Sequence, residues 1–447
     1  MSSLFAIPLP MWGCLFGSLL LRIASAASAS LTALILAGAY LPSVSGDINV
    51  AGLITLGTAS LLSLLTGAFY LAELSTAPIF GALSDRSGRR RFMELGVACG
   101  AVAITLLIVG LSLESSVRLP ASVTILILLA IFFLKGFSTA SSAPATLGYI
   151  AETSVEDVGL RGRIVGVYEI ATAGGLLGGS VLGAKLWDSF GPDALFASLA
   201  SYLLAAVAFW MVREVSKRSG GGHRILESLS VLKNIHLLRF APAWLAVNAV
   251  LGLWLTHAVL QAAEDDATGQ LLAGGFTGNE IGNGMALFGL IFGAGMLFWS
   301  LQLERINKTT IMLIATGAGV IEGVFLYALN HSPEQATLQI IAFATVVGAS
   351  VFVLAGFTPA ALAYLADISD ENPVHRGPVM GAYSMLLGVG QLVGAGIGGP
   401  LADAWHMDGL IFGTVGLILV AGVTVVALRR YDRWSETAFR ARTGTLA

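Results

Sequence analysis

Charged residues are scarce in this chain of 447 residues: only 11% are Asp, Glu, Lys or Arg, against about a quarter in ordinary soluble domains. Two cysteines, Cys14 and Cys99, are too few for a disulfide framework or a cysteine-ligated zinc site. The chain has no G-x-x-x-x-G-K-[ST] loop and no H-E-x-x-H sequence. These absences argue against direct use of ATP and against an embedded hydrolase. We therefore predict no enzyme activity, no metal and no cofactor.

Apolar residues are abundant instead: 56% of the chain is hydrophobic and the mean hydropathy is +0.82. About 20 apolar residues in a helix cross about 30 Å of hydrocarbon. Such stretches predict an all-α membrane protein with twelve transmembrane helices, at residues 15–41, 51–80, 92–113, 121–151, 163–187, 194–213, 240–262, 281–302, 310–329, 336–366, 377–402 and 408–428.

The basic residues fall on one side of this predicted topology. If the N-terminus is cytoplasmic, 20 of the 24 Lys and Arg residues lie in the inner loops or in the C-terminal tail. The positive-inside rule then places both termini in the cytoplasm of a multi-pass cell-membrane protein. The net charge of −3 gives no indication of a nucleic-acid partner. The apolar spans instead predict that the chain is embedded in a lipid bilayer.

The chain repeats itself at an offset of 215 residues. Residues 147–186 align without a gap on residues 362–401, which places spans 4 and 5 over spans 10 and 11. We therefore expect a six-helix half at 1–213, a cytoplasmic linker at 214–238, a second half at 239–429 and a tail at 430–447. Parallel repeats of this kind are one plan of secondary transporters, with the binding site between the halves.

The stretch "GALSDRSGRR", residues 81–90, fits the loop signature G-x-L-x-D-R-x-G-R-R of the major facilitator superfamily. The chain resembles this family over essentially its whole length. The glycines of helix 5 also resemble the pattern of that family, although Ser180 replaces the proline and Phe132 replaces the fourth-helix arginine. Matching glycines in the two halves are expected to pack helices closely. They are Gly166, Gly175, Gly179 and Gly183, with Gly381, Gly390, Gly394 and Gly398.

The resemblance implies a conformational latch at the cytoplasmic side. Asp85 would pack against the start of helix 11, Gly81 would allow that approach, and Gly88 would permit the turn. Arg89 or Arg90 would pair with Glu152 at the end of helix 4. The remaining latch candidates are Arg86 and, in the second half, Glu304, Arg305 and Asp367. The alternative is that the arginines only set the topology, which we prefer for Arg91.

Ionisable residues within the spans are candidates for substrate binding or coupling, because charge in a bilayer is costly. Lys135 lies deep in helix 4 and is followed by a polar stripe that includes Ser138 and Ser142. We expect Lys135 to bind substrate or to couple transport; the alternative is a structural ion pair. The other candidates are Glu73, Glu169, Arg22, His257, Glu322, Asn248 and Trp254. For Arg22 the alternative is an interfacial position with residues 11–21 as a surface helix. For Glu73, Glu169, Glu322 and His257 the alternative is a structural role.

These features predict a secondary active transporter that moves a small organic solute by alternating access. We expect proton-coupled efflux of an amphipathic drug or metabolite by a monomer. One alternative is uptake or exchange of an organic anion held by Lys135. Another, of a different class, is a membrane assembly factor or sensor that no longer transports.

Overall fold

The computed structural model describes residues 9–38, 40–44, 48–50, 54–117, 119–153, 158–213, 235–264, 269–370 and 376–443. Nearly all of them are helical, because a backbone in hydrocarbon must satisfy its own hydrogen bonds. The helices of the first half are α1 (Leu9–Ala37), α2 (Thr58–Ser87), α3 (Arg89–Ser116), α4 (Ala121–Thr153), α5 (Val158–Phe190) and α6 (Leu195–Trp210). Those of the second half are α8 (Ile235–Ala263), α9 (Gly278–Gln302), α10 (Lys308–Asn330), α11 (Thr337–Leu354), α12 (Phe357–Asp370) and α13 (Arg376–Thr443).

Among the described residues, ten helical segments are long and apolar enough to cross a membrane. Two of them, of 44 and 48 residues, are too long for one crossing of about 30 Å. The first contains the turn η3 (Gly191–Ala194) and the second contains the non-helical residue His406. Divided at these turns, the segments give the twelve predicted crossings, with α11 and α12 together forming the tenth.

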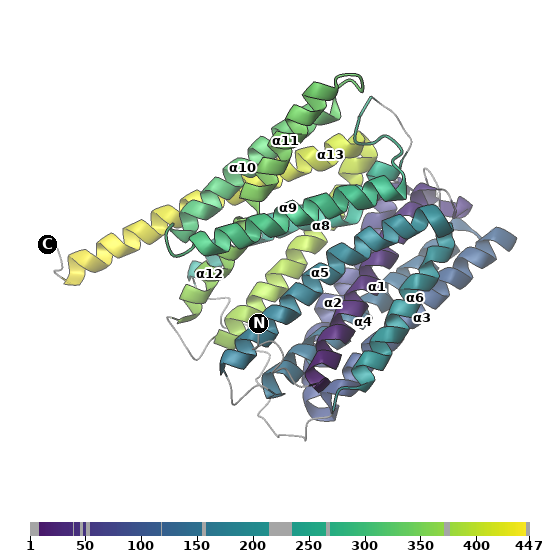
Figure 1. Ribbon diagram of the computed structural model, residues 1–447, viewed down its shortest axis with the longest axis horizontal. Helices are drawn as coiled ribbons and strands as arrows, with labels where there is room; N and C mark the ends of the chain where they lie inside the picture. The colour runs from purple at the N-terminus through teal and green to yellow at the C-terminus, as the bar shows by residue number, and fades with distance from the viewer. Residues whose placement is uncertain are drawn as a thin grey trace.

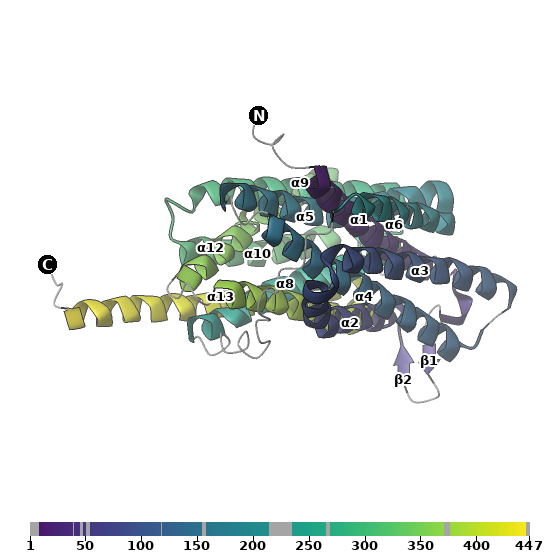
Figure 2. The same ribbon diagram turned by 90° about the horizontal axis from the view of Figure 1, so that it is seen from below.

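Two expectations about where helices begin were not met. Residues 54–57 do not extend span 2 as a helix, because β2 (Ile54–Leu56) pairs with β1 (Ile48–Val50) in an antiparallel hairpin, preceded by η2 (Pro42–Val44). This hairpin projects from one end of the molecule (Figure 2). The other is the alternative for Arg22, in which residues 11–21 form a separate surface helix. They belong to the continuous α1, because Gly13 and Gly17 let this segment pack directly on α6.

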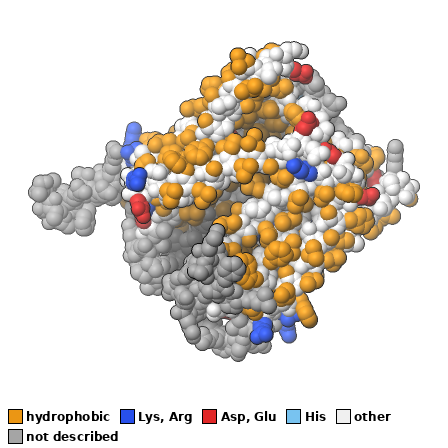
Figure 3. Space-filling view, in the orientation of Figure 1, with side chains coloured by type: hydrophobic (Ala, Val, Ile, Leu, Met, Phe, Trp, Pro, Cys, Tyr) orange, Lys and Arg blue, Asp and Glu red, His pale blue; other side chains and the backbone are white. Residues whose placement is uncertain are grey.

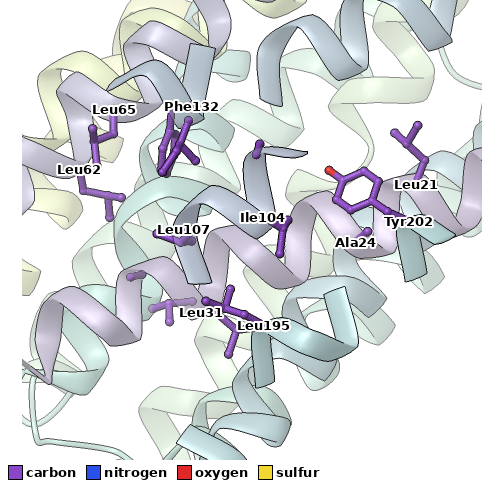
Figure 4. Close-up of a cluster of buried hydrophobic side chains, with 14 of the residues drawn as sticks. Leu21, Ala24, Leu31, Leu62, Leu65, Ile104, Leu107, Phe132, Leu195 and Tyr202 are labelled. Carbon is purple, nitrogen blue, oxygen red and sulfur yellow. The ribbon is translucent and has the colours of Figure 1, made fainter. Parts of the chain in front are cut away.

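The helices form two bundles, α1–α6 and α8–α13, that lie side by side with their long axes roughly aligned (Figure 1). In the first bundle, the buried side chains of α1, α3, α4 and α6 interlock around Leu31, Ile104, Leu107 and Tyr202 (Figure 4). This apolar cluster continues into the second bundle through Leu253, Ala402 and Leu410. A separate cluster in the second bundle surrounds Phe240, Trp244 and Phe357.

The two ends of the molecule carry opposite charge. We call one the basic end; it holds the starts of α3, α8 and α10, and its Lys and Arg residues include Arg86, Arg89, Arg90, Arg91, Arg213, Arg239, Arg305, Lys308, Arg429 and Arg430. We call the other the acidic end; its charged residues include Glu114, Asp188, Asp193, Glu280, Glu334, Asp403 and Asp408. Between them, the face shown in Figure 3 is mostly apolar, with most basic groups at the left and bottom edges and most acidic groups at the top and right.

Candidate functional site

A group of charged side chains from α1, α2 and α5 lies midway along the first half. Arg22 interacts electrostatically with the carboxylates of Glu73 and Glu169, and Tyr168, next to Glu169 in the chain, also lies near its guanidinium. Glu169 is exposed although it lies well inside α5, and Arg22 and Glu73 are half-buried. One residue beyond Glu73, Leu74 contacts Gly388 of the second half. The group therefore lies beside the contact between α2 and the second half; we call it the central charge cluster.

Lys135 lies elsewhere. Its side chain is 2% exposed, and Nζ is 4.7 Å from the centroid of the Phe132 ring. Among the described residues, none of the ion pairs within 4 Å includes Lys135. Ser138 and Ser142 pack against Gly96 of α3. The polar stripe of α4 is therefore turned toward α3 within the first bundle, and Lys135 is buried there.

His257 is completely buried at the contact between the two halves. Its Nε2 atom is 3.2 Å from Oγ of Ser63 on α2 and 3.1 Å from the carbonyl oxygen of Ala395 on α13. Ser63 donates to the same carbonyl at 2.5 Å and accepts from the N–H of Gly399 at 3.0 Å. The structure thus places His257 in a polar contact that joins the halves. The sequence did not single out Ser63, because it is an ordinary serine in an apolar run.

The other candidates of the second half bond within that half. The Asn248 amide donates to the Trp244 carbonyl at 2.8 Å, and the Trp254 indole donates to Thr414 at 2.7 Å. Glu322 lies on α10, and its Oε2 atom is buried without a hydrogen-bond partner among the described residues. The structure does not bring these three residues together with the central charge cluster.

The signature loop forms a compact network at the basic end. The Arg89 guanidinium donates to Oε1 of Glu152 at 2.8 and 3.0 Å and to Oγ of Ser84 at 2.8 Å, and it pairs with Asp85. Gly88 adopts φ 106°, a value that favours glycine. Arg89, rather than Arg90, is therefore the partner of Glu152.

The neighbouring residues of the signature loop also stay in the first half. Arg90 pairs with Glu94 at 2.7 Å. The nearest described neighbour of Gly81 is Pro144 of α4, not the start of α13, which contains the eleventh predicted span. Arg86 is exposed. The side chains at the start of α13, which Asp85 was expected to meet, lie outside the described residues.

The second half has its own version of this network. Lys308 at the start of α10 pairs with Asp367 on α12, whereas Glu304 and Arg305 are exposed. The sequence analysis missed Lys308, although it lies four residues after Glu304, as Arg89 lies four residues after Asp85. In both halves the described ion pairs at the basic end therefore join helices of the same half.

The repeated glycines lie where helices approach closely. A Cβ atom at Gly175, Gly179 or Gly183 would collide with α1, and one at Gly390, Gly394 or Gly398 would collide with α8. Spans 5 and 11 thus pack in the same way on spans 1 and 7. Gly166 and Gly381 lie outside the residues whose side-chain surroundings are described.

The sequence profile of the Major Facilitator Superfamily matches residues 15–264 and 268–444. The chain belongs to the major facilitator superfamily. Its resemblance to this family and its fold class, two repeated six-helix halves, are thereby confirmed. Two crystal structures of the nucleoside transporter NupG superimpose on it with TM-scores of 0.66 and 0.64 at 12% identity, covering 95% and 93% of this chain and 99% and 98% of theirs. At that identity they support the fold alone.

Curated members of the major facilitator superfamily are also similar in sequence. The Quinolone resistance protein NorA of Staphylococcus aureus (strain MRSA252) is 22% identical over 389 residues, which cover 84% of this chain and 89% of that protein. Multidrug resistance protein 1 of Bacillus subtilis (strain 168) is 22% identical over 400 residues, covering 86% and 90%. The protein is thus a multi-pass membrane transporter of small molecules.

Proposed function

We propose that this transporter exports amphipathic organic cations across the plasma membrane in exchange for protons, as a monomer with both termini in the cytoplasm. The observation that carries the proposal is the central charge cluster. Its two carboxylates, Glu73 and Glu169, outnumber the single guanidinium of Arg22. An acidic lining of this kind can hold either a solute cation or protons, which is the requirement for exchange between them.

The composition of the space between the halves favours a solute that is also apolar. The charges of the central cluster lie among apolar groups: Leu74, next to Glu73, meets Gly388 of the second half, and Tyr168, next to Glu169, belongs to the apolar cluster of the first half. The similarity to NorA and to Multidrug resistance protein 1 supports drug-like substrates, since the names of both proteins refer to drug resistance. The basic end faces the cytoplasm in this proposal, in agreement with the positive-inside rule.

Transport by purified protein in liposomes would test this function. The liposomes contain a pH-sensitive dye and receive ethidium as a lipophilic cation, Nile red as a neutral lipophile or fluorescein as an organic anion. We expect ethidium flux that is driven by a pH difference and moves protons in the opposite direction. Glu169→Gln and Glu73→Gln should each lower this flux by at least about tenfold, because each removes a charge that the cation or proton needs. Glu94→Gln is the matched control, since Glu94 lies at the basic end, away from the cluster.

Other outcomes would assign a different function. Fluorescein flux that is lost in Lys135→Ala would replace the proposal with anion transport. Ethidium flux without proton movement would leave export but remove the exchange. If folded protein moves none of the three compounds at any pH difference, the proposal of cation efflux is wrong and a non-transporting role gains support.

A further inference from the structure

Two carboxylates join the halves at the acidic end. Asp403 of α13 accepts hydrogen bonds from the backbone N–H groups of Ala59 and Ser60, both at 3.0 Å, in the first turn of α2. Asp188 of α5 accepts from the N–H groups of Gly278 and Asn279, both at 2.7 Å, in the first turn of α9. A helix leaves the N–H groups of its first turn unpaired, and its dipole favours negative charge there. Each carboxylate therefore caps a helix of the opposite half.

The two caps are related by the internal repeat. Asp403 lies 215 residues after Asp188, the same offset that aligns the two halves. The residues that turn the chain just beyond them also correspond: Gly191 and His406 both have φ 53° and are separated by the same offset. The caps are thus reciprocal, as in the interface of a two-fold symmetric dimer, where one patch meets its own copy. A reciprocal contact ties both edges of the interface at once.

A glycine makes room for each carboxylate. A Cβ atom on Gly57, at the N-cap of α2, would collide with the carboxylate of Asp403. A Cβ atom on Gly278 would collide with the carbonyl oxygen of Ala184 and lie 2.7 Å from Oδ1 of Asp188. The close fit of both contacts therefore depends on residues of the helix that is capped as well as on the two aspartates.

The contact between α5 and α9 does not continue along their whole length. Below the cap of α9, Gly282 packs on Val181 and Lys185, and a Cβ atom on Gly289 would lie 3.4 Å from Leu177. Nearer the basic end, a Cβ atom on Gly293 or Gly174 would meet nothing described within 4 Å. Figure 1 shows α5 and α9 converging toward the acidic end. Along α5 and α9, the two halves thus meet at the acidic end and separate toward the basic end.

We propose that Asp188 and Asp403, with the first turns of α9 and α2, form a paired lock that holds the acidic end closed. Both caps must break when the space between the halves opens at that end, because each connects one half to the other. The proposal rests on alternating access by this transporter but not on its substrate, its direction or its coupling ion. The lock is asymmetric. Helix α9 has its own capping box of Thr277 and Glu280, whereas α2 has a glycine N-cap without a side-chain hydrogen bond. The cap by Asp403 therefore contributes more to holding the acidic end closed than the cap by Asp188.

Distances between pairs of spin labels would test the lock. In a background of Cys14→Ala and Cys99→Ala, one pair of cysteines is introduced at Ser116 and Gln335 for the acidic end and another at Met211 and Leu301 for the basic end. Asp188→Asn and Asp403→Asn keep the size of the side chain and remove its charge. We expect each to raise the ratio of long to short distances at the acidic end by about three- to tenfold, with the larger shift for Asp403→Asn. In the double variant the two factors should multiply, and the distance at the basic end should shorten.

The controls are Asp193→Asn and Glu334→Gln, two exposed acids at the same end without a described contact to the other half; neither should change the distances. Amide hydrogen exchange on the same samples separates the proposal from a purely local role. If exchange rises in the first turns of α2 and α9 while the distances stay as in the wild type, the aspartates only stabilise helix ends and the lock is wrong. A failure to transport any compound would not affect this result, since the measurement reads conformation alone.

Discussion

The two ends of this transporter use their charged side chains differently. At the basic end, the described ion pairs of Arg89 with Glu152 and of Lys308 with Asp367 each join helices of one half. At the acidic end, Asp188 and Asp403 bond to helices of the opposite half. Rocking of two rigid halves must preserve contacts of the first kind and break contacts of the second kind. The comparison therefore separates the residues that keep each half rigid from those that decide which end is open.

The largest effect is expected from a covalent link across the acidic end. Gly57→Cys combined with Asp403→Cys places two thiols within disulfide reach, because a Cβ atom on Gly57 would meet the Asp403 side chain. Oxidation should lower transport by at least about tenfold and reduction should restore it, since the link prevents opening at that end. The flux assay checks this, with each single variant under oxidant as the control. If protein that mass spectrometry shows to be cross-linked keeps full transport activity, the acidic end does not need to open at this contact.

A bulky side chain at the same contact should oppose closing rather than opening. Gly278→Val would push against the carbonyl of Ala184 and against Asp188. We expect it to keep the acidic end apart and to reduce flux several-fold, because one of the two alternating states becomes inaccessible. Gly284→Val is the matched control on the same helix, since a Cβ atom there meets nothing described within 4 Å. Equal effects of the two variants on flux would mean that the close approach at Gly278 is unimportant.

A smaller effect is expected at the basic end. Arg89→Gln, Glu152→Gln and the double variant form a cycle that measures the coupling between two partly exposed groups, which we expect to be about 1 kcal/mol or less. Denaturant unfolding in detergent micelles would measure it. The label distances at the acidic end should stay unchanged, because the pair lies within one half. A change in those distances would show that this pair also acts between the halves.

The sequence was sufficient to predict the features that lipid and internal repetition impose. Spans, halves and the pairing of the signature loop with Glu152 follow from apolar runs, from the 215-residue offset and from a motif. It was not sufficient for Lys135, because the period of a helix shows that a polar stripe exists but not which neighbour it faces. The caps of Asp188 and Asp403 were missed for another reason. The two aspartates lie two positions beyond the aligned stretches 147–186 and 362–401, and a contact between halves depends on which end is closed.

A similarly small effect is expected at the two turns that follow the caps. Gly191 and His406 share φ 53°, a conformation that costs little for glycine but about 1–3 kcal/mol for other residues. His406→Gly should therefore stabilise the protein by about 1 kcal/mol, because the relief of strain exceeds the added chain entropy of glycine. Gly191→Ala should destabilise it by a similar amount. Apparent melting temperatures in detergent would measure both. If His406→Gly lowers the melting temperature while the distances at the acidic end stay short, contacts of the imidazole outweigh the strain, and the two turns share φ but not its energetic cost.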